Sequence, residues 1–332
     1  MSDVTEGLAL PEAPTFRDIL RAQRLIAQYL RPTPLLFSRA LSRGLGCEAY
    51  VKCENIQPVG AFKVRGGLNY LANLPDAERA RGVVTASTGN HGQSIAFAAR
   101  AFGVRAIIAA PEGANPYKVQ AMRDLGAEVV LTGKDFDEAR AWVEWATHEY
   151  GYRYIHSANE PLLIAGVGTM ALELLQDEPD IDVIIVPIGG GSSASGISIA
   201  AKAINPDIQV IGVQAEGAPA AYHAWQSGDL KEWPTMETFA EGLATRVPFA
   251  LTQQIMRRLL DDIVLVSDAE LRLAMVLLLD TTHQLAEGAG AASTAAARKL
   301  GPRLAGKKVA LILSGGNATL DQVRSALDES PN

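Results

Sequence analysis

A glycine cluster after an apolar run is the strongest chemical signal in this sequence. The run leads into Gly189, Gly190, Gly191, Ser192 and Ser193, and a helical pattern follows. Glycines let the backbone approach an anion closely, and a helix start presents unpaired N–H groups and a positive dipole end. The two serine hydroxyls can add donors. The segment therefore predicts a phosphate-binding loop, although a tight strand–helix turn remains an alternative.

A lysine in apolar company is the second signal. Lys63 lies between Phe62 and Val64, in a segment that continues with Arg65. Burial disfavours an ammonium ion, so it would lower the pKa of this amine and favour the neutral form that a Schiff-base lysine needs. Taken by itself, the segment is more simply explained by a surface lysine that lies over its neighbours.

Small polar residues gather where another helix is predicted to begin. Ser87, Thr88, Gly89, Asn90 and His91 follow an apolar run and precede a helical pattern. Hydroxyls and backbone N–H groups at a helix start suit the carboxylate of a small substrate. Because serine, threonine and asparagine are also common caps, an ordinary capped helix is the alternative.

Ser314 opens a fourth segment, Ser-Gly-Gly-Asn, directly after the apolar run at 308–313. At the carboxyl end of a strand, its hydroxyl could meet a ring nitrogen, and a plain turn is the alternative.

Short apolar runs alternate with helical stretches along most of the chain, which predicts an α/β fold with a mostly parallel sheet covered on both faces. A helix is predicted from Thr15, as its N-cap, through Leu30, because Arg31-Pro32-Thr33-Pro34 ends it. Another is predicted over 268–287, with His283 and Glu287 paired on one face. The predicted strands are 49–53, 82–86, 104–110, 127–132, 182–188, 208–215, 262–266 and 308–313.

Composition narrows the class of protein. The chain has 332 residues, 48% of them apolar and 20% charged, which indicates a globular protein with a sizeable core. A net charge of −7 argues against nucleic-acid binding. No apolar run approaches a membrane span, and the acidic, proline-broken residues 1–14 do not resemble a signal peptide, so we expect a cytoplasmic protein.

Nothing in the sequence indicates a metal site. The only cysteines are Cys47 and Cys53, which form no metal-binding pair, and the five histidines show no metal-ligand spacing.

In this order, the four segments resemble those of the fold-type II pyridoxal-phosphate enzymes, closest to the serine/threonine dehydratase and serine racemase group. The likeness extends over residues 15–320 and includes Arg31-Pro32-Thr33-Pro34 and the stretch 241–244. It implies a tryptophan synthase β-like fold with two domains of open, twisted, mostly parallel sheets and helices on both faces. We expect a large cofactor-binding domain, 1–55 plus 160–332, and a small domain, 56–159, that carries the substrate-carboxylate loop.

The resemblance also implies residue roles. Lys63 would carry pyridoxal 5'-phosphate as a Schiff base and act as the base, with Phe62 near the ring and Asn90 on the phenolic oxygen. Ser314 would face the pyridine nitrogen. The phosphate would be held by Gly189, Gly190, Gly191, Ser192 and Ser193, and the substrate carboxylate by Ser87, Thr88, Gly89, Asn90 and His91.

The activity that the resemblance implies is β-elimination of water from a 3-hydroxy amino acid, L-threonine or L-serine by default, to give a 2-oxo acid and ammonia. Less common substrates stay open: 3-hydroxyaspartate, phenylserine or a hydroxyectoine-derived amino acid. Arg246 could pair with a second substrate carboxylate, or it could be an ordinary surface arginine. Ser314 cannot keep the ring nitrogen protonated as an aspartate would, which favours rapid elimination.

A racemase is the main alternative. Thr88 stands where racemases of the group carry a serine base, so racemisation is less expected. A β-replacement synthase, a catalytically silent cofactor-binding module and a nucleotide-binding oxidoreductase are further alternatives. Some members hold a divalent cation with carboxylates where this chain has Gln214, Ala218 and Ala220, so we expect no metal here. Members of the family usually assemble as dimers or tetramers, so the resemblance implies a homodimer.

Overall fold

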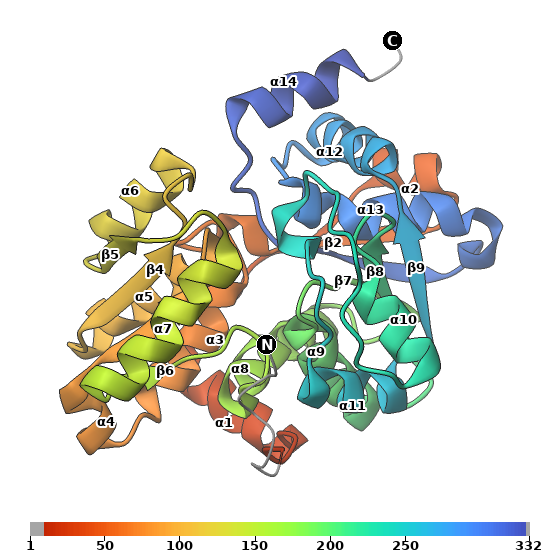
Figure 1. Cartoon of the computed structure of the whole chain (residues 1–332). Helices are drawn as coiled ribbons and strands as arrows, with labels where there is room; N and C mark the ends of the chain where they lie inside the picture. The colour runs from red at the N-terminus through yellow and green to blue at the C-terminus, as the bar shows by residue number, and fades with distance from the viewer. Residues whose placement is uncertain (1–9, 330–332) are drawn as a thin grey trace.

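Two β-sheets and the helices around them make up the computed structural model, which describes residues 10–329 (Figure 1). The larger sheet has six strands in the order β1-β2-β10-β7-β8-β9, and the smaller has four in the order β5-β4-β3-β6. All neighbouring strands are parallel except β1 and β2. The expected α/β class with mostly parallel sheets is therefore confirmed.

The strands of the larger sheet are β1 (Leu35–Phe37), β2 (Glu48–Cys53), β7 (Val183–Pro187), β8 (Gln209–Ala215), β9 (Asp262–Val266) and β10 (Lys308–Leu313). Those of the smaller sheet are β3 (Val83–Ala86), β4 (Ala106–Ala110), β5 (Glu128–Leu131) and β6 (Arg153–Tyr154). Each of the eight strands expected from apolar runs is present. The sequence analysis missed β1 and β6, because segments of three and two residues carry no readable alternation.

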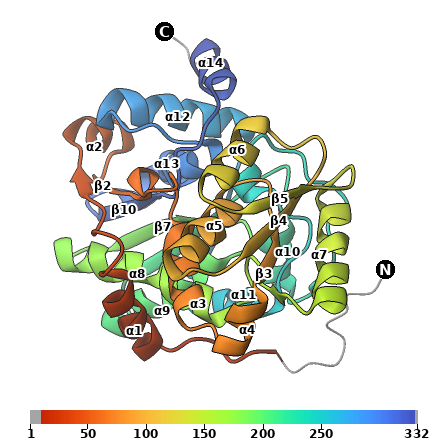
Figure 2. The ribbon, with the colours of Figure 1, turned by 90° about the vertical axis from the view of Figure 1, so that its left-hand side faces the viewer.

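Helices cover both faces of each sheet, as Figures 1 and 2 show. The longer ones are α1 (Phe16–Ile26), α3 (Lys63–Ala72), α5 (Asn90–Phe102), α7 (Phe136–Tyr150), α8 (Pro161–Asp177), α9 (Ser192–Ile204), α11 (Ala250–Leu259), α12 (Asp268–Thr282) and α13 (Gly288–Leu300). The shorter ones are α2 (Arg39–Leu45), α4 (Asp76–Arg81), α6 (Pro116–Asp124), α10 (Ala220–Ser227) and α14 (Leu320–Asp328), with single 3₁₀ turns at η1 (Glu54–Ile56), η2 (Glu241–Leu243) and η3 (Gly301–Leu304).

The main hydrophobic core lies between the two sheets and is filled by α3, α5, α8 and α9. The position of strand β7 explains why its sequence is apolar throughout. Ile184 and Val186 face this core, whereas Val183 and Ile185 face a second core beneath α12 and α13. Successive side chains of a strand point to opposite faces, so a strand buried on both faces needs a continuous apolar run.

Two helices end earlier in the structure than the sequence predicted. Helix α1 begins after Thr15, the expected N-cap, whose side chain forms a capping box with Asp18, but it ends near Ala27 rather than at Leu30. Helix α12 ends at His283, which caps it in the left-handed conformation with φ of 58°. Residues 283–287 are therefore not helical, and the expected helix-face pair between His283 and Glu287 was wrong.

Two sequence expectations concern a signal peptide and membrane-spanning segments. Residues 1–9, most of the segment judged not to be a signal peptide, lie outside the described residues. Between residues 10 and 329, no helix combines the length and the apolar character that crossing a bilayer requires.

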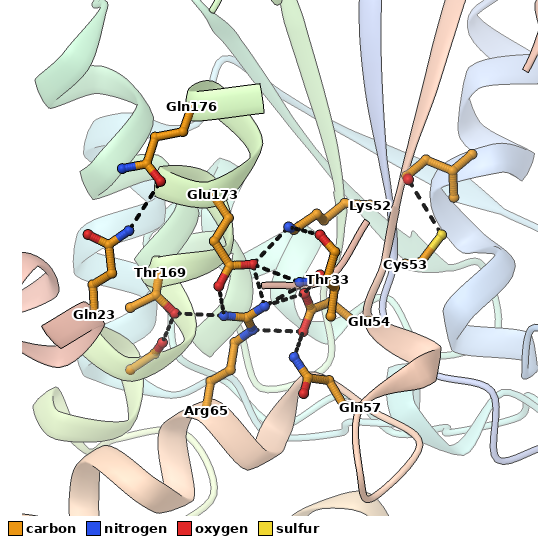
Figure 3. A network of polar contacts seen from close by, with 12 residues as sticks. Gln23, Thr33, Lys52, Cys53, Glu54, Gln57, Arg65, Thr169, Glu173 and Gln176 are labelled. Carbon is orange, nitrogen blue, oxygen red and sulfur yellow. Dashed lines mark hydrogen bonds and ion pairs between the residues drawn. The ribbon is translucent and has the colours of Figure 1, made fainter. Parts of the chain in front are cut away.

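A buried cluster of four charged side chains ties three parts of the fold together (Figure 3). The guanidinium of Arg65, on α3, donates to both oxygens of Glu54, each at 2.8 Å, and to both oxygens of Glu173 on α8, at 2.6 and 2.7 Å. Lys52 of β2 adds a contact of 2.8 Å to Glu173. We call Lys52, Glu54, Arg65 and Glu173 the charge quartet.

The quartet is electrically balanced and almost fully removed from water. The side chains of Arg65, Glu54 and Lys52 have no exposed surface, and that of Glu173 is 8% exposed. Burial alone would raise the pKa of Glu54, but the charge of Arg65 and its hydrogen bonds outweigh burial and hold that pKa below its ordinary value. Two cations therefore offset two carboxylates in a space that tolerates no single charge.

We expect Arg65→Met to destabilise the protein by about 3–5 kcal/mol, because it leaves two buried carboxylates without their donor. Urea unfolding followed by circular dichroism measures the change. The control is Arg105→Met, which breaks the exposed pair with Glu128 and should cost less than about 1 kcal/mol. Equal stability of the two variants would contradict a structural role for the quartet.

Candidate functional site

Three of the four predicted segments lie at carboxyl ends of parallel strands, where open α/β sheets bind ligands. Ser87 follows β3, Gly189 follows β7, and Ser314 follows β10. The fourth segment, with Lys63, comes next to Ser314 through the backbone: the N–H of Phe62 donates to the Ser314 carbonyl at 3.0 Å. A bridge between Ala61 and Gly315 extends this contact. The fold therefore brings the Lys63 and Ser314 segments side by side.

Lys63 begins helix α3, and its amine is held in largely apolar surroundings. Its Nζ atom lies 3.4 Å from the carbonyl oxygen of Ser157 and 5.3 Å from the centre of the Phe62 ring. No carboxylate pairs with this amine among residues 10–329. Loss of hydration lowers the pKa of Lys63 from 10.5 to about 8. The predicted shift towards a neutral amine is confirmed in direction.

The glycine loop is packed too closely for side chains. A Cβ atom on Gly189 would lie 2.1 Å from the carbonyl oxygen of Gly242, and one on Gly190 would lie 2.8 Å from the Cβ of Ala158. Gly191 has φ of 90°, which favours glycine. The loop leads directly into α9, a helix of 13 residues whose first N–H groups have no partner within the helix.

The two serines of this loop lie at the start of α9 and are buried. Ser193 donates its hydroxyl to the carbonyl of Pro187 at 3.0 Å. Its side chain therefore holds the loop, while its backbone N–H belongs to the open first turn of α9. Backbone N–H groups, a helix dipole and close-packed glycines are the features that an anion-binding loop needs, and phosphate binding by this loop stays a prediction.

In the loop before α5, two predicted substrate-binding side chains make internal contacts. The Ser87 hydroxyl accepts from the N–H groups of Gly89 at 3.2 Å and Gly92 at 2.9 Å. His91 is buried with Nε2 3.0 Å from the Thr85 hydroxyl. Burial, with a smaller effect of the nearby Lys63 charge, lowers the pKa of His91 to about 3. Its imidazole is therefore neutral and supplies no positive charge for a carboxylate.

Asn90 and Ser314 each contact a residue at the start of α13. Asn90 donates from Nδ2 to Oε1 of Glu287 at 2.7 Å, and its Oδ1 accepts from Asn317 at 2.8 Å. The hydroxyl of Ser314 is buried and lies 3.4 Å from the carbonyl oxygen of Ala289. Burial raises the pKa of the Glu287 carboxyl above its ordinary value, and the Asn90 contact partly offsets this rise.

Sequence reasoning gave no role in the site to two residues that contact Asn90. Asn317 was part of the Ser-Gly-Gly-Asn segment without a task of its own, and Glu287 was expected to pair with His283. Lys118, on α6, lies 3.9 Å from a Cβ built on Gly89 and pairs with Glu241. Glu241 stood in the family-like stretch 241–244, which was the one usable clue to this pair.

Arg246, which was weighed in the sequence analysis, and Glu216, which lies close to Gln214 and Ala218, have partners within the chain. Arg246 forms ion pairs with Asp137 and with Glu232, the latter at 3.5 Å, so its guanidinium is already matched by two carboxylates. Near β8, Glu216 pairs with the Lys299 ammonium at 2.9 Å. Within residues 10–329, no three His, Cys, Asp or Glu side chains come close enough together to hold a metal ion.

Comparison with known proteins identifies the family. The model of the family described as pyridoxal-phosphate dependent enzyme matches residues 26–315. This chain belongs to that family. It is 44% identical to the L-threonine ammonia-lyase of Geobacter sulfurreducens over 300 residues, covering 90% of this chain and 74% of the relative. It is 40% identical to the catabolic L-threonine dehydratase of Escherichia coli over 308 residues, covering 92% and 94%.

Solved structures agree with the family. The structure of maize serine racemase superimposes with a TM-score of 0.90 at 33% identity, covering 96% of this chain and 98% of that one. The fold-type II class expected from the motifs is thus confirmed. As a pyridoxal-phosphate enzyme, the chain needs a phosphate cradle and an amine, and the glycine loop and Lys63 have the chemistry to fit both groups.

We expect Gly189→Ala to weaken pyridoxal-phosphate binding about tenfold or more, because the new methyl group would collide with the Gly242 carbonyl and displace the loop. Titration of the apoenzyme with pyridoxal phosphate, in which equilibrium dialysis measures the bound cofactor, gives the Kd. Gly44→Ala is the control: it lies in α2 with open space around the added Cβ. An unchanged Kd in Gly189→Ala would rule out the loop as the cradle.

Proposed function

We propose that this pyridoxal-phosphate enzyme is an ammonia-lyase that removes water from a 3-hydroxy amino acid, with L-threonine and L-serine as substrates, to give a 2-oxo acid and ammonia. The observation that carries this proposal is its 40–44% identity to proteins named L-threonine ammonia-lyase and L-threonine dehydratase, over at least 90% of the chain. The arrangement of Lys63, the glycine loop and the α5 start supports it.

Different residues of this chain have different roles in the proposed site. Lys63 would hold the cofactor covalently through Nζ, and the glycine loop with the start of α9 would hold its phosphate. Phe62 would lie beside the ring, and Ser314 would face the ring nitrogen. When bound, the cofactor would supply the electron sink that stabilises negative charge at the substrate Cα. Once the substrate amine has replaced it on the cofactor, the free Lys63 amine would accept the α-proton, a task for which an amine with a pKa of about 8 is well suited.

The substrate carboxylate is assigned to the start of α5. The cluster Ser87, Thr88, Gly89, Asn90 and His91 contributes there mainly through backbone N–H groups and the Thr88 hydroxyl, because the Ser87 hydroxyl and the neutral His91 ring make internal contacts. A helix N-terminus attracts a carboxylate without a full positive charge. Lys118 lies near this loop, with its charge matched by Glu241.

The ion pairs of Arg246 and Lys118 help to choose between substrates. A 3-hydroxyaspartate would bring a second carboxylate, and this carboxylate would need a cation that is not already paired within the protein. Arg246 is paired with Asp137 and Glu232, and Lys118 is paired with Glu241. These pairs favour an uncharged substrate side chain, as in threonine and serine, over 3-hydroxyaspartate. Phenylserine and a hydroxyectoine-derived amino acid stay as further candidates.

Racemisation is the second candidate function. The fold resembles that of maize serine racemase over nearly its whole length. Thr88 stands where racemases of the group carry a serine base, and its bulkier hydroxyl side chain disfavours that role. Chiral chromatography of recovered substrate separates the two activities, because a racemase returns the opposite enantiomer without releasing 2-oxo acid.

Three broader features complete the proposal. The chain would work in the cytoplasm, an expectation from the sequence of residues 1–14 and its short apolar runs, and as a homodimer, an expectation from the family resemblance. A large domain, 1–55 plus 160–332, would bind the cofactor, and a small domain, 56–159, would carry the carboxylate loop. The smaller sheet lies within the second range and the larger sheet within the first.

We expect Lys63→Ala to lose turnover by about 10²- to 10⁴-fold or more, because it removes both the covalent anchor and the base. The measurement is release of 2-oxo acid and ammonia across a panel of 3-hydroxy amino acids, in both enantiomers and in threo and erythro forms. Lys231→Ala, at an exposed ion pair with Asp229, is the control and should keep full activity. Normal turnover by Lys63→Ala would end the proposal.

The lowered pKa of Lys63 predicts a pH dependence. A neutral amine attacks the cofactor aldehyde, and its fraction rises about tenfold per pH unit up to a pKa near 8, then levels off. The rate at which apoenzyme captures pyridoxal phosphate, measured by stopped-flow absorbance, should therefore level off near pH 8. With Nα-acetyl-lysine, whose amine has an ordinary pKa of about 10.4, the rate should keep rising towards pH 10. Parallel profiles would contradict the shift.

A further inference from the structure

Asn90 is held by two side chains that come from the other sheet. Asn90 begins α5 beside the smaller sheet, whereas Asn317 follows β10 of the larger sheet and Glu287 directly precedes α13. Asn317 Nδ2 donates to Asn90 Oδ1 at 2.8 Å, and Asn90 Nδ2 donates to Glu287 Oε1 at 2.7 Å. We call Asn317 and Glu287 the Asn90 clamp.

The hydrogen bonds of the clamp fix which way round the Asn90 amide lies. Asn317 Nδ2 also lies 2.9 Å from the backbone carbonyl of Val59. A carbonyl only accepts, so the Asn317 atom at this position must be the NH₂ group. The same NH₂ group meets Asn90, which must therefore present its oxygen. The Asn90 NH₂ group is left facing Glu287, whose carboxylate accepts.

This arrangement turns the oxygen of Asn90 towards Asn317 and leaves one of its N–H bonds without a partner. One of its two N–H bonds goes to Glu287, and no other acceptor for Asn90 Nδ2 occurs among residues 10–329. A reversed amide would place its oxygen against the Glu287 carboxylate, and its NH₂ group against the NH₂ group of Asn317. Both contacts would be repulsive, so the observed orientation is strongly preferred.

The clamp is continuous with the backbone that carries Lys63. Gly316 donates to the Gly60 carbonyl at 2.9 Å, and Glu287 donates its N–H to the Gly315 carbonyl at 3.1 Å. Space there is tight, since a Cβ on Gly60 would lie 2.4 Å from Asn317 Oδ1. Side chain and backbone contacts therefore lock Asn90 relative to the segment that bears the amine.

We propose that Asn317 and Glu287 are positioning residues that hold the Asn90 amide with one N–H free to donate to the ring oxygen of pyridoxal phosphate. This inference rests on the proposed site, in which Asn90 contacts that oxygen. It assigns a task to the asparagine of the Ser-Gly-Gly-Asn segment, and it makes the cofactor contact depend on a bond between elements of both sheets.

Asn317→Asp tests the clamp with almost no change of shape. An aspartate cannot donate to Val59 or to Asn90, and its oxygens favour the reversed Asn90 amide. We expect the Kd of pyridoxal phosphate for the apoenzyme to rise about tenfold or more, and the visible absorption maximum of the bound cofactor to shift. Asn73→Asp is the matched control, because the Asn73 amide donates to the Asn69 carbonyl at 2.7 Å away from the clamp. Its Kd and absorption maximum should equal those of the wild type.

A double-mutant cycle shows whether Asn317 acts through Asn90. In an Asn90→Ala background, Asn317→Asp should change the Kd by less than about twofold, because the amide it orients is gone. The same tenfold loss in both backgrounds would mean that Asn317 only supports the loop, and would overturn the inference. An unchanged Kd and absorption maximum in Asn317→Asp alone would overturn it equally.

Glu287 provides a second test, which decides the matter if Asn317→Asp does not fold. Glu287→Gln keeps an acceptor for Asn90 and should hold the Kd within about threefold, whereas Glu287→Ala should raise it about tenfold. Equal values for the two would overturn the clamp. These results are distinct from failure of the proposed site, which would show as wild-type enzyme without cofactor attached to Lys63 in a peptide map after borohydride reduction. They are also distinct from failure of the proposed function, which would show as wild-type enzyme that releases no 2-oxo acid.

Discussion

The charge quartet of Lys52, Glu54, Arg65 and Glu173 is the interaction on which the position of Lys63 depends. Arg65 lies two residues after Lys63 on the same helix, and its guanidinium is bound on both sides by buried carboxylates. None of the four charges is tolerable alone in that space, so they are stable only as a set. This requirement links α3 to β2, η1 and α8 (Figure 3). It thereby fixes the start of α3, where Lys63 lies.

Close backbone approach is the second constraint on the site. The Lys63 and Ser314 segments exchange backbone hydrogen bonds, and Gly189 approaches the Gly242 carbonyl more closely than a side chain would allow. Glycines at these points are therefore required by packing between segments as much as by the conformation of single turns. The same contacts bring N–H groups from different strands towards one space, which is what binding a phosphate and a carboxylate requires.

Many polar side chains in this space stabilise the protein rather than face a ligand. The hydroxyls of Ser87 and Ser193 bond to the backbone, and His91 is buried and uncharged. The groups left for chemistry are backbone N–H groups, the Lys63 amine and a few hydroxyls. A site with few mobile charges preserves the low polarity that lowers the pKa of Lys63, since a nearby carboxylate would raise that pKa again.

Local pattern was enough to predict a large part of this molecule. The eight longer strands, the Thr15 cap and the glycine loop could be predicted because each depends on neighbouring residues: an apolar run, a capping box, or a turn that only glycine permits. The ordered motifs likewise predicted the family, and the family model agrees. The sequence did not predict strands β1 and β6 or the end of α12 at His283, because short segments and helix caps carry weak local signals.

What the sequence by itself determined is therefore the set of elements, the residue types that can do chemistry and the family. The tertiary structure decided how those residues are used. Arg65 meets Glu173 across 108 residues, Asn90 meets Glu287 across 197, and Asn317 meets Asn90 across 227. Such contacts have no periodicity along the chain, and they form only when two separate sheets are packed against a shared layer of helices. The partner of a buried charge or amide is for that reason a property of the fold, whereas the strand or helix that carries it is a property of local sequence.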